Sequence, residues 1–390
     1  MSSLIQFFKS NIRQNGMVIA LVFIMVLFQI LTRGILFRPM NITNLVLQNS
    51  YILILAIGML LCILTGNIDL SVGSVVAFVG AIAAVMMVNM NIGVAATIVL
   101  SLGIGVVVGM FHGAFIAFAR IPAFIVTLAG MLIFRGLTLV ILKGQTIGPF
   151  ERSFQSIAAG YLPGREIEIA GYNVVALVAG VVLSVYFVVG LLISRAGKAR
   201  YGFDVLPVAI EAARIVFIVA AVNVLTLSLA AHNGIPIILV LLAALILLYT
   251  FVTRKTVFGR HIYALGGNEK AARLSGVKTQ KVLFLVYTNM GLLAALAGLV
   301  VAGRLNAATP KAGTMFELDA IAAAFIGGAS ASGGIGTVVG AVVGGLVMGV
   351  LNNGMSIVGV SVDWQQAIKG LVLLAAVSFD VYTKNKAHAS

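Results

Sequence analysis

The feature that most constrains this chain is a series of long apolar runs that carry almost no charge. Stretches such as 45–64, 93–118 and 282–303 reach the ~20 residues that an α-helix needs to cross about 30 Å of hydrocarbon. Hydrophobic residues make up 61% of the sequence and charged residues only 9%, against roughly 25% charged residues in soluble domains. Membrane β-barrels are excluded because they show short alternating segments. The sequence therefore predicts an all-α, polytopic transmembrane helical bundle.

The runs and the breaks between them predict about twelve helices in a single transmembrane domain, 1–390. We place them near 17–37, 45–64, 71–88, 93–118, 122–142, 172–194, 212–230, 235–253, 282–303, 319–329, 335–358 and 364–382. The first run follows two basic residues, as in a signal peptide. It continues to Phe37 without a small-residue cleavage site, however, which favours an uncleaved helix.

Residues 254–281 are a polar, basic interruption between two apolar runs, with Glu269 as their single acid. Such a segment cannot lie in hydrocarbon, and its core, NEKAARLSG, predicts a short capped helix. If the amino terminus is cytoplasmic, most Lys and Arg residues fall in loops on that side, which places both termini and this loop in the cytoplasm. The net charge of +14 is then explained by topology and by attraction to anionic lipid, not by nucleic-acid binding.

Two further loops leave alternatives open. The loop 143–171, which mixes acids with Gly and Pro, either covers an extracellular mouth or is a passive connector. The basic loop 195–211 is either a topological anchor or a second docking site. Glycines spaced four residues apart predict faces where helices approach closely, because small residues allow contact where lipid provides no hydrophobic drive.

Two breaks interrupt the apolar runs at points where function is expected. In TGNIDLSVGS, 65–74, Asp69 is either a functional intramembrane acid or the cap of the next helix. In the segment 316–337, Glu317 and Asp319 stand where a helix begins, beside the positive end of its dipole. The glycine-rich run that follows is either a re-entrant element, tolerated where protein or a water-filled cavity surrounds it, or an ordinary turn.

Enzymatic motifs are missing from the sequence. There is no GxSxG or HExxH pattern, the four histidines are scattered, and no GxxxxGK[ST] phosphate-binding loop is present. The single cysteine, Cys62, lies in an apolar run and offers no metal cluster. We expect no enzyme activity, no metal and no cofactor in this chain. A transporter of this kind either couples to a cation gradient or takes its energy from a separate ATPase.

Several segments resemble the permeases of bacterial ABC importers for monosaccharides, the ribose, xylose, arabinose and galactose group. They are the stretch around 257–282 (FGRHIYALGGNEKAARLSGVKTQKV), GNIDLSVGS at 66–74, IPAFIVTLAGMLIFRGL at 121–137, ELDAIAAAFIGGASASGGIGTVVGA at 317–341 and LNNGMSIVGV at 351–360. The resemblance implies the ten-helix permease architecture, here with an extra hairpin at about 172–234. The longer xylose-type and multiple-monosaccharide members are the most similar.

The resemblance also implies partners: cytoplasmic ABC ATPase subunits, an extracellular sugar-binding protein and a second copy of the permease. The loop 254–281 is similar to the family's coupling helix, which fits a groove on the ATPase. The coupling residues implied are Gly266, Gly267, Asn268, Glu269, Ala271, Ala272, Arg273 and Gly276.

Candidates for the translocation path are polar residues at the first break and near the last helices: Asn67, Asp69, Ser71, Asn352 and Asn353. We expect alternating access, driven by the ATPases and carried through residues 266–277. A cation-coupled secondary sugar transporter is the rival function, and a membrane scaffold is a third class.

Overall fold

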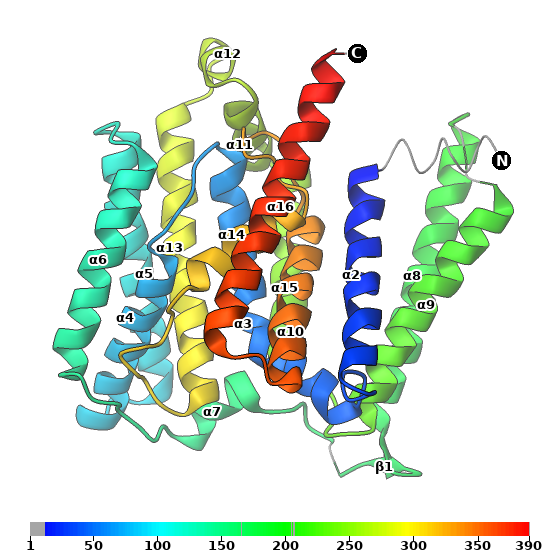
Figure 1. Ribbon diagram of the computed structural model, residues 1–390, viewed down its shortest axis with the longest axis horizontal. Coiled ribbons are helices and arrows are strands. Elements are labelled where there is room, and N and C mark those ends of the chain that lie inside the picture. The colour runs from blue at the N-terminus through cyan, green and yellow to red at the C-terminus, as the bar shows by residue number, and fades with distance from the viewer. Residues whose placement is uncertain (1–11, 165, 204, 206, 390) are drawn as a thin grey trace.

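The computed structural model describes residues 12–164, 166–203, 205 and 207–389 (Figure 1). Its long helices are α2 (Ile12–Leu31), α3 (Pro39–Leu64), α4 (Val72–Ala84) continued by the π-helical turn η1 (Val85–Asn89), α5 (Val94–Ala117), α6 (Ala123–Leu142), α8 (Val174–Arg200), α9 (Val208–Ala230), α10 (Ile237–Lys255), α13 (Thr279–Leu305), α14 (Phe316–Ile326), α15 (Val338–Val358) and α16 (Val362–Ala389). Every predicted helix is therefore present. The all-α fold class is confirmed.

Shorter elements complete the chain. They are α7 (Arg152–Ala159), the two-residue strands β1 (Glu168–Ile169) and β2 (Tyr172–Asn173), α11 (Val257–Gly267) and α12 (Glu269–Leu274). Within the described residues, nine helices are long and apolar enough to span a membrane. The hairpin expected at 172–234 is formed by α8 and α9, which pack along each other and contact the rest of the bundle mainly through α3.

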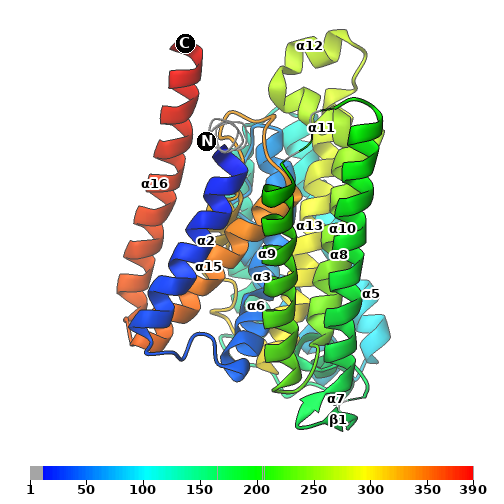
Figure 2. The ribbon, with the colours of Figure 1, turned by 90° about the vertical axis from the view of Figure 1, so that its right-hand side faces the viewer.

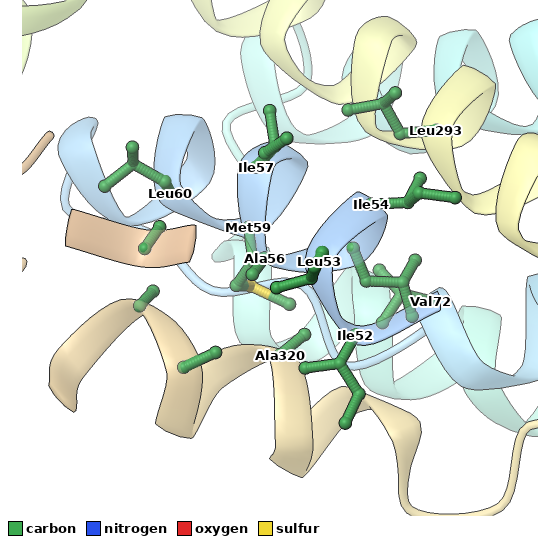
Figure 3. Close-up of a cluster of buried hydrophobic side chains, with 14 of the residues drawn as sticks. Ile52, Leu53, Ile54, Ala56, Ile57, Met59, Leu60, Val72, Leu293 and Ala320 are labelled. Atoms are coloured by element: carbon green, nitrogen blue, oxygen red, sulfur yellow. The ribbon is translucent and has the colours of Figure 1, made fainter. Parts of the chain in front are cut away.

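The core is centred on α3, which is buried on almost every side. Ile52, Leu53 and Ile57 of this helix point toward side chains from α13 and α14, among them Leu293 and Ala320 (Figure 3). A helix that is apolar around its whole circumference must be enclosed by protein or by lipid. In this chain, protein encloses α3.

Two sets of four helices have matching layouts. In each set, α3–α6 and α13–α16, a long helix is followed by a non-helical segment, a short helix and two long helices. The contacts correspond, because α13 packs on α4 and α5 whereas α3 packs on α14 and α15. The two sets run in opposite directions, since α3 ends and α13 begins at the end of the bundle that carries α12 (Figure 1). This is the inverted repeat found in many transporters.

The short helices α4 and α14 begin at the same place. An ideal Cβ on Gly73 would overlap the Gly313 carbonyl oxygen, and one on Gly313 would overlap that of Gly73. The two backbones therefore touch directly. With 11 residues, α14 is about 16 Å long and cannot cross the hydrocarbon. The break that precedes it, 306–315, is thus the interrupted part of this span, and the glycine-rich run 327–336 is the loop that leads into α15.

Glycines at four-residue spacing make close helix contacts, as the sequence predicts. On α5, Gly105 lies against Gly291 of α13, and a Cβ there would be 2.6 Å from the Gly291 carbonyl oxygen. A Cβ on Gly109, one turn further, would be 2.8 Å from the Cα of Thr288. Larger side chains at these positions would push α5 and α13 apart, so the glycines set the helix separation.

Candidate functional site

The helix α12 stands beyond one end of the bundle, connected to it by α11 and by the start of α13 (Figures 1 and 2). Its N-cap is Asn268, whose side-chain oxygen accepts a hydrogen bond from the Ala271 backbone N–H at 3.0 Å. Gly276 follows the helix with φ +85°, a left-handed conformation that glycine adopts without strain. The short capped helix predicted for NEKAARLSG is present, and both of its ends are fixed by local backbone chemistry.

One face of α12 is open. Ala272 is its single buried residue, at 6% exposure, and packs toward the bundle. Glu269, Arg273 and Leu274 are exposed, and Leu274 is 89% exposed. An apolar side chain between charged neighbours on a projecting helix is typical of a contact that another protein covers. Sequence reasoning missed Leu274 because it had treated the charged and small residues as the contact; the signal was a leucine inside a polar loop.

At the base of α11 and α12, glycine residues let backbone segments from distant parts of the chain contact one another. This contact is called the glycine joint. A Cβ on Gly266 would overlap the carbonyl oxygen of Leu64, the last residue of α3, and would lie 2.6 Å from the backbone nitrogen of Gly334. That same nitrogen donates a hydrogen bond of 2.9 Å to the Leu64 carbonyl. The hydroxyl of Tyr263 on α11 donates to the Gly336 carbonyl at 2.7 Å. Burial raises the pKa of this phenol, so the hydroxyl keeps its proton at neutral pH.

The joint brings together three segments that are far apart in the sequence. They are the polar loop 254–281, the start of the first break 65–74 and the glycine-rich run 327–336. Gly333 fits between them, since a Cβ there would be 3.0 Å from the Gly66 nitrogen and 2.9 Å from the Gly266 oxygen. Backbone contacts of this kind leave no flexible side chain to absorb movement. The end of α11 is therefore in direct backbone contact with the end of α3 and with the loop that joins α14 to α15.

Asp69 and Ser71 form a buried polar cluster at the first break. The Asp69 carboxylate accepts hydrogen bonds from the Ser71 backbone N–H at 2.8 Å and from its hydroxyl at 2.6 Å. Ser71 occupies the N-cap position of α4 and makes no side-chain cap bond of its own, so Asp69 satisfies a backbone N–H at the start of the helix, in line with one of the two expectations for it. The Ser71 hydroxyl oxygen also lies 3.4 Å from Nδ1 of His112 on α5. Asn67 is separate from this cluster and bonds to Thr65.

The other two path candidates lie elsewhere. Asn353 on α15 exchanges two amide hydrogen bonds with Asn41 in the first turn of α3, at 2.9 and 3.1 Å. Asn67 lies just past the opposite end of that 26-residue helix, about 39 Å away along the axis. Asn353 therefore joins α15 to α3 through a pair of amide hydrogen bonds, called the Asn41–Asn353 clasp below, and Asn352 is its neighbour in the sequence. The structure does not bring the five candidates together.

Buried charges surround the start of α14. Lys369 Nζ of α16 lies 2.9 Å from Oδ1 of Asp319, and the Tyr51 hydroxyl donates to Oδ2 of the same carboxylate at 3.2 Å. Arg135 of α6 donates to the carbonyl oxygens of Pro310 and Ala312, at 3.2 and 2.6 Å, and so holds the non-helical segment before α14. Sequence reasoning found the acid but not its partner, because the lysine lies in a different helix.

A helical bundle with inverted repeats, half-length helices that meet inside it and a projecting basic helix is the architecture of a membrane transporter. Residues 41–377 match the family described as branched-chain amino acid transport system / permease component. The chain belongs to this family of permease components. It is a multi-pass membrane permease, and its family consists of transport subunits, not of catalytic ones.

Named relatives match over nearly the whole chain. The xylose transport system permease protein XylH of Haemophilus influenzae is 37% identical over 96% of this chain and 98% of its own length. XylH of Escherichia coli K12 is 37% identical over 96% of this chain and 93% of its own. The ribose import permease protein RbsC of Escherichia coli K12 is 33% identical over 96% and 95%. No solved structure gives a significant match.

Proposed function

We propose that this chain is the permease subunit of an ATP-binding cassette importer that moves a monosaccharide, with a xylose-like pentose favoured, across the bacterial inner membrane. The observation that carries the proposal is α12, an exposed capped helix whose base contacts the end of α3 and the glycine-rich run 327–336 through Gly266. Support for the substrate comes from the relatives, which are named for xylose or ribose. The energy is supplied by separate ATPase subunits.

The partners follow from this assignment. ATPase subunits bind α12 in the cytoplasm, so this end of the bundle, where α2 begins and α16 ends, is the cytoplasmic one. A sugar-binding protein delivers substrate at the opposite end, which carries α7 and the β1–β2 hairpin. A second copy of the chain completes the path.

In the proposed mechanism, closure of the ATPases on ATP displaces α12. The joint at Gly266 moves α3 and the glycine-rich run 327–336 with it. The helices α4 and α14 begin at one backbone contact, Gly73 against Gly313. Movement of either repeat therefore shifts the position of this contact between them. The path between the two copies then opens to the binding protein, and hydrolysis resets it.

Uptake of labelled D-xylose by proteoliposomes tests the function. We expect accumulation only when the chain is reconstituted with its ATPase and binding protein and ATP is present on the ATPase side. A cation gradient alone is expected to drive no uptake. If the chain by itself accumulates sugar in response to a proton or sodium gradient, it is a secondary transporter. The buried Asp69–Ser71–His112 cluster is the observation that favours this rival.

The replacement Leu274→Asp tests the docking of α12. An aspartate would place a charge in the apolar centre of the contact, so we expect co-purification of the ATPase to fall at least about tenfold, the effect of losing a contact worth about 1.4 kcal/mol. Membrane insertion is expected to be unchanged because the side chain is 89% exposed. Leu305→Asp, at an exposed position on the opposite end of α13, is the matched control. Equal ATPase recovery with both variants would contradict the docking role.

A further inference from the structure

A cavity of about 240 Å³ lies between α14, α15 and α16, away from the coupling element. One face of α14 contributes Leu318, Asp319 and Ala322, and one face of α16 contributes Gln366, Lys369 and Leu373. Ala322 lies three and four positions after Asp319 and Leu318, and the three α16 residues are three or four positions apart, so each set lies on one side of its helix. The volume is below the 300–1,000 Å³ or so of pockets for drug-sized ligands. It suits a smaller molecule.

The polar groups of the cavity are arranged for hydroxyl groups. The carboxylate of Asp319 accepts hydrogen bonds from Lys369 and Tyr51. The Lys369 ammonium, at 19% side-chain exposure, has three N–H donors and uses one of them for Asp319. The exposed Gln366 amide makes no hydrogen bond within the described residues. An ammonium, a carboxylate and a free amide together offer donors and acceptors to a neutral ligand rich in hydroxyls.

The rest of the lining is apolar. Leu318, Met348 and Leu373 face the same space, where they can cover the C–H face of a sugar ring. Pockets that combine an apolar wall with a few convergent polar groups are typical of small-molecule sites. A purely apolar ligand would make no hydrogen bond to the Lys369 ammonium or the Gln366 amide, and an ion would gain nothing from the leucines. An amphipathic, uncharged ring fits both parts of the lining.

Burying the Lys369–Asp319 ion pair inside the helical bundle costs desolvation free energy. Lysine and aspartate are rarely placed within membrane segments unless they serve a path or a substrate, and an apolar pair of similar volume often holds two helices at least as well. The cavity is also next to the point where α14 begins, where Met315 has φ +65°. A left-handed backbone at a residue other than glycine is a local strain that often marks a functional site.

We propose that this cavity is a low-affinity binding station for one monosaccharide in the translocation path, with Gln366, Lys369 and Asp319 contacting its hydroxyl groups. The inference rests on the proposed function and adds a site inside the permease to the one in the binding protein. Low affinity is required, since a ligand held tightly in the path would not leave it. A dissociation constant of about 10 mM leaves only about 2.7 kcal/mol of binding free energy to overcome.

Cysteine labelling in the reconstituted complex tests the station. The chain has one cysteine, Cys62, which is buried, so Cys62→Ala gives a background without reactive thiols. Leu318→Cys then places a thiol in the cavity wall, and Leu371→Cys, on an exposed part of α16 outside the cavity lining, is the control. D-Xylose at about 100 mM, ten times the expected dissociation constant, is predicted to slow maleimide labelling of Leu318→Cys about tenfold. Sucrose at equal osmolality, too large for the cavity, is predicted to have no effect.

A second variant separates ligand contact from general shielding. Adding Gln366→Leu to Leu318→Cys removes one hydrogen-bonding group but leaves the ion pair intact. The D-xylose concentration that gives half protection is predicted to rise about threefold to tenfold, the effect of one hydrogen bond. If Leu318→Cys does not assemble, Leu373→Cys on α16, a partly exposed lining residue, is used in the same design.

Two results would overturn the station. One is labelling of the cavity cysteine at the same rate with and without D-xylose, D-ribose or D-glucose. The other is equal protection of Leu371→Cys, which would show that sugar acts on the whole complex. Either result, obtained with a complex that imports D-xylose, rejects the station and leaves the proposed function standing. Failure of the complete complex to import any of these sugars rejects the proposed function instead.

Discussion

Replacing Gly266 with alanine is expected to abolish coupled sugar uptake. The added Cβ would overlap the Leu64 carbonyl oxygen and lie 2.6 Å from the Gly334 nitrogen. Both are backbone atoms, so no side chain can rotate away, and one of the three segments must move. Overpacking of this kind costs about 1–3 kcal/mol. Thermal unfolding in detergent, and uptake by the reconstituted complex, measure the two effects.

Gly267→Ala is the matched control for this substitution. Gly267 is the next residue along the same helix, and a Cβ there would meet nothing within 4 Å. The melting temperature of this variant is therefore expected to equal that of the parent, and its uptake is expected to exceed that of Gly266→Ala. Equal behaviour of the Gly266 and Gly267 variants would mean that the joint yields without consequence. Movement of α12 would then have to reach the breaks by another route.

Replacing Lys369 with methionine is expected to destabilise the protein strongly. The change leaves Asp319, whose side chain is 3% exposed, as a buried charge without its partner. Breaking a buried ion pair from one side typically costs about 3–5 kcal/mol. The Tyr51 hydroxyl, which still donates to the carboxylate at 3.2 Å, offsets only part of this cost. Thermal unfolding of the detergent-solubilised protein measures the loss.

The double variant Asp319→Leu/Lys369→Met is expected to recover most of the lost stability. Removing both charges also removes the desolvation cost that the single variant leaves uncompensated. A double variant as unstable as Lys369→Met alone would show that the two side chains do not act as a pair. With the second single variant, Asp319→Leu, these proteins form a double-mutant cycle that measures the coupling between the two side chains.

The apolar runs were sufficient to predict all twelve main helices, because hydrocarbon dictates the composition of membrane helices and the length of those that span it. Their boundaries were less well predicted. The helix α3 begins at Pro39, six residues before its predicted start at 45, since proline suits the first helical turn and Asn41 finds a partner in Asn353. The short α7 and the β1–β2 hairpin were missed because elements of eight and two residues leave no periodic signal.

In the candidate site, too, features set by neighbouring residues were predicted and contacts between distant segments were not. The cap at Asn268 and the turn at Gly276 depend on neighbouring residues, so the sequence pattern was enough to predict the helix between them. The contacts of Gly266 with Leu64 and Gly334 depend on segments far along the chain. No pattern in the sequence around Gly266 indicates these long-range contacts. For the same reason, Asp319 was recognised as an acid at a helix start whereas its pairing with Lys369 was not.

The Asn41–Asn353 clasp has a consequence for biosynthesis. Its two amides are 312 positions apart in the chain, so α3 enters the membrane long before the ribosome has made its partner. Until then, the Asn41 amide nitrogen can bond only to the nearby Leu36 carbonyl, and its oxygen must be satisfied by water or lipid headgroups at the membrane surface. The first repeat is therefore inserted as an unfinished intermediate, and truncation before α15 is expected to leave it open to quality-control proteases.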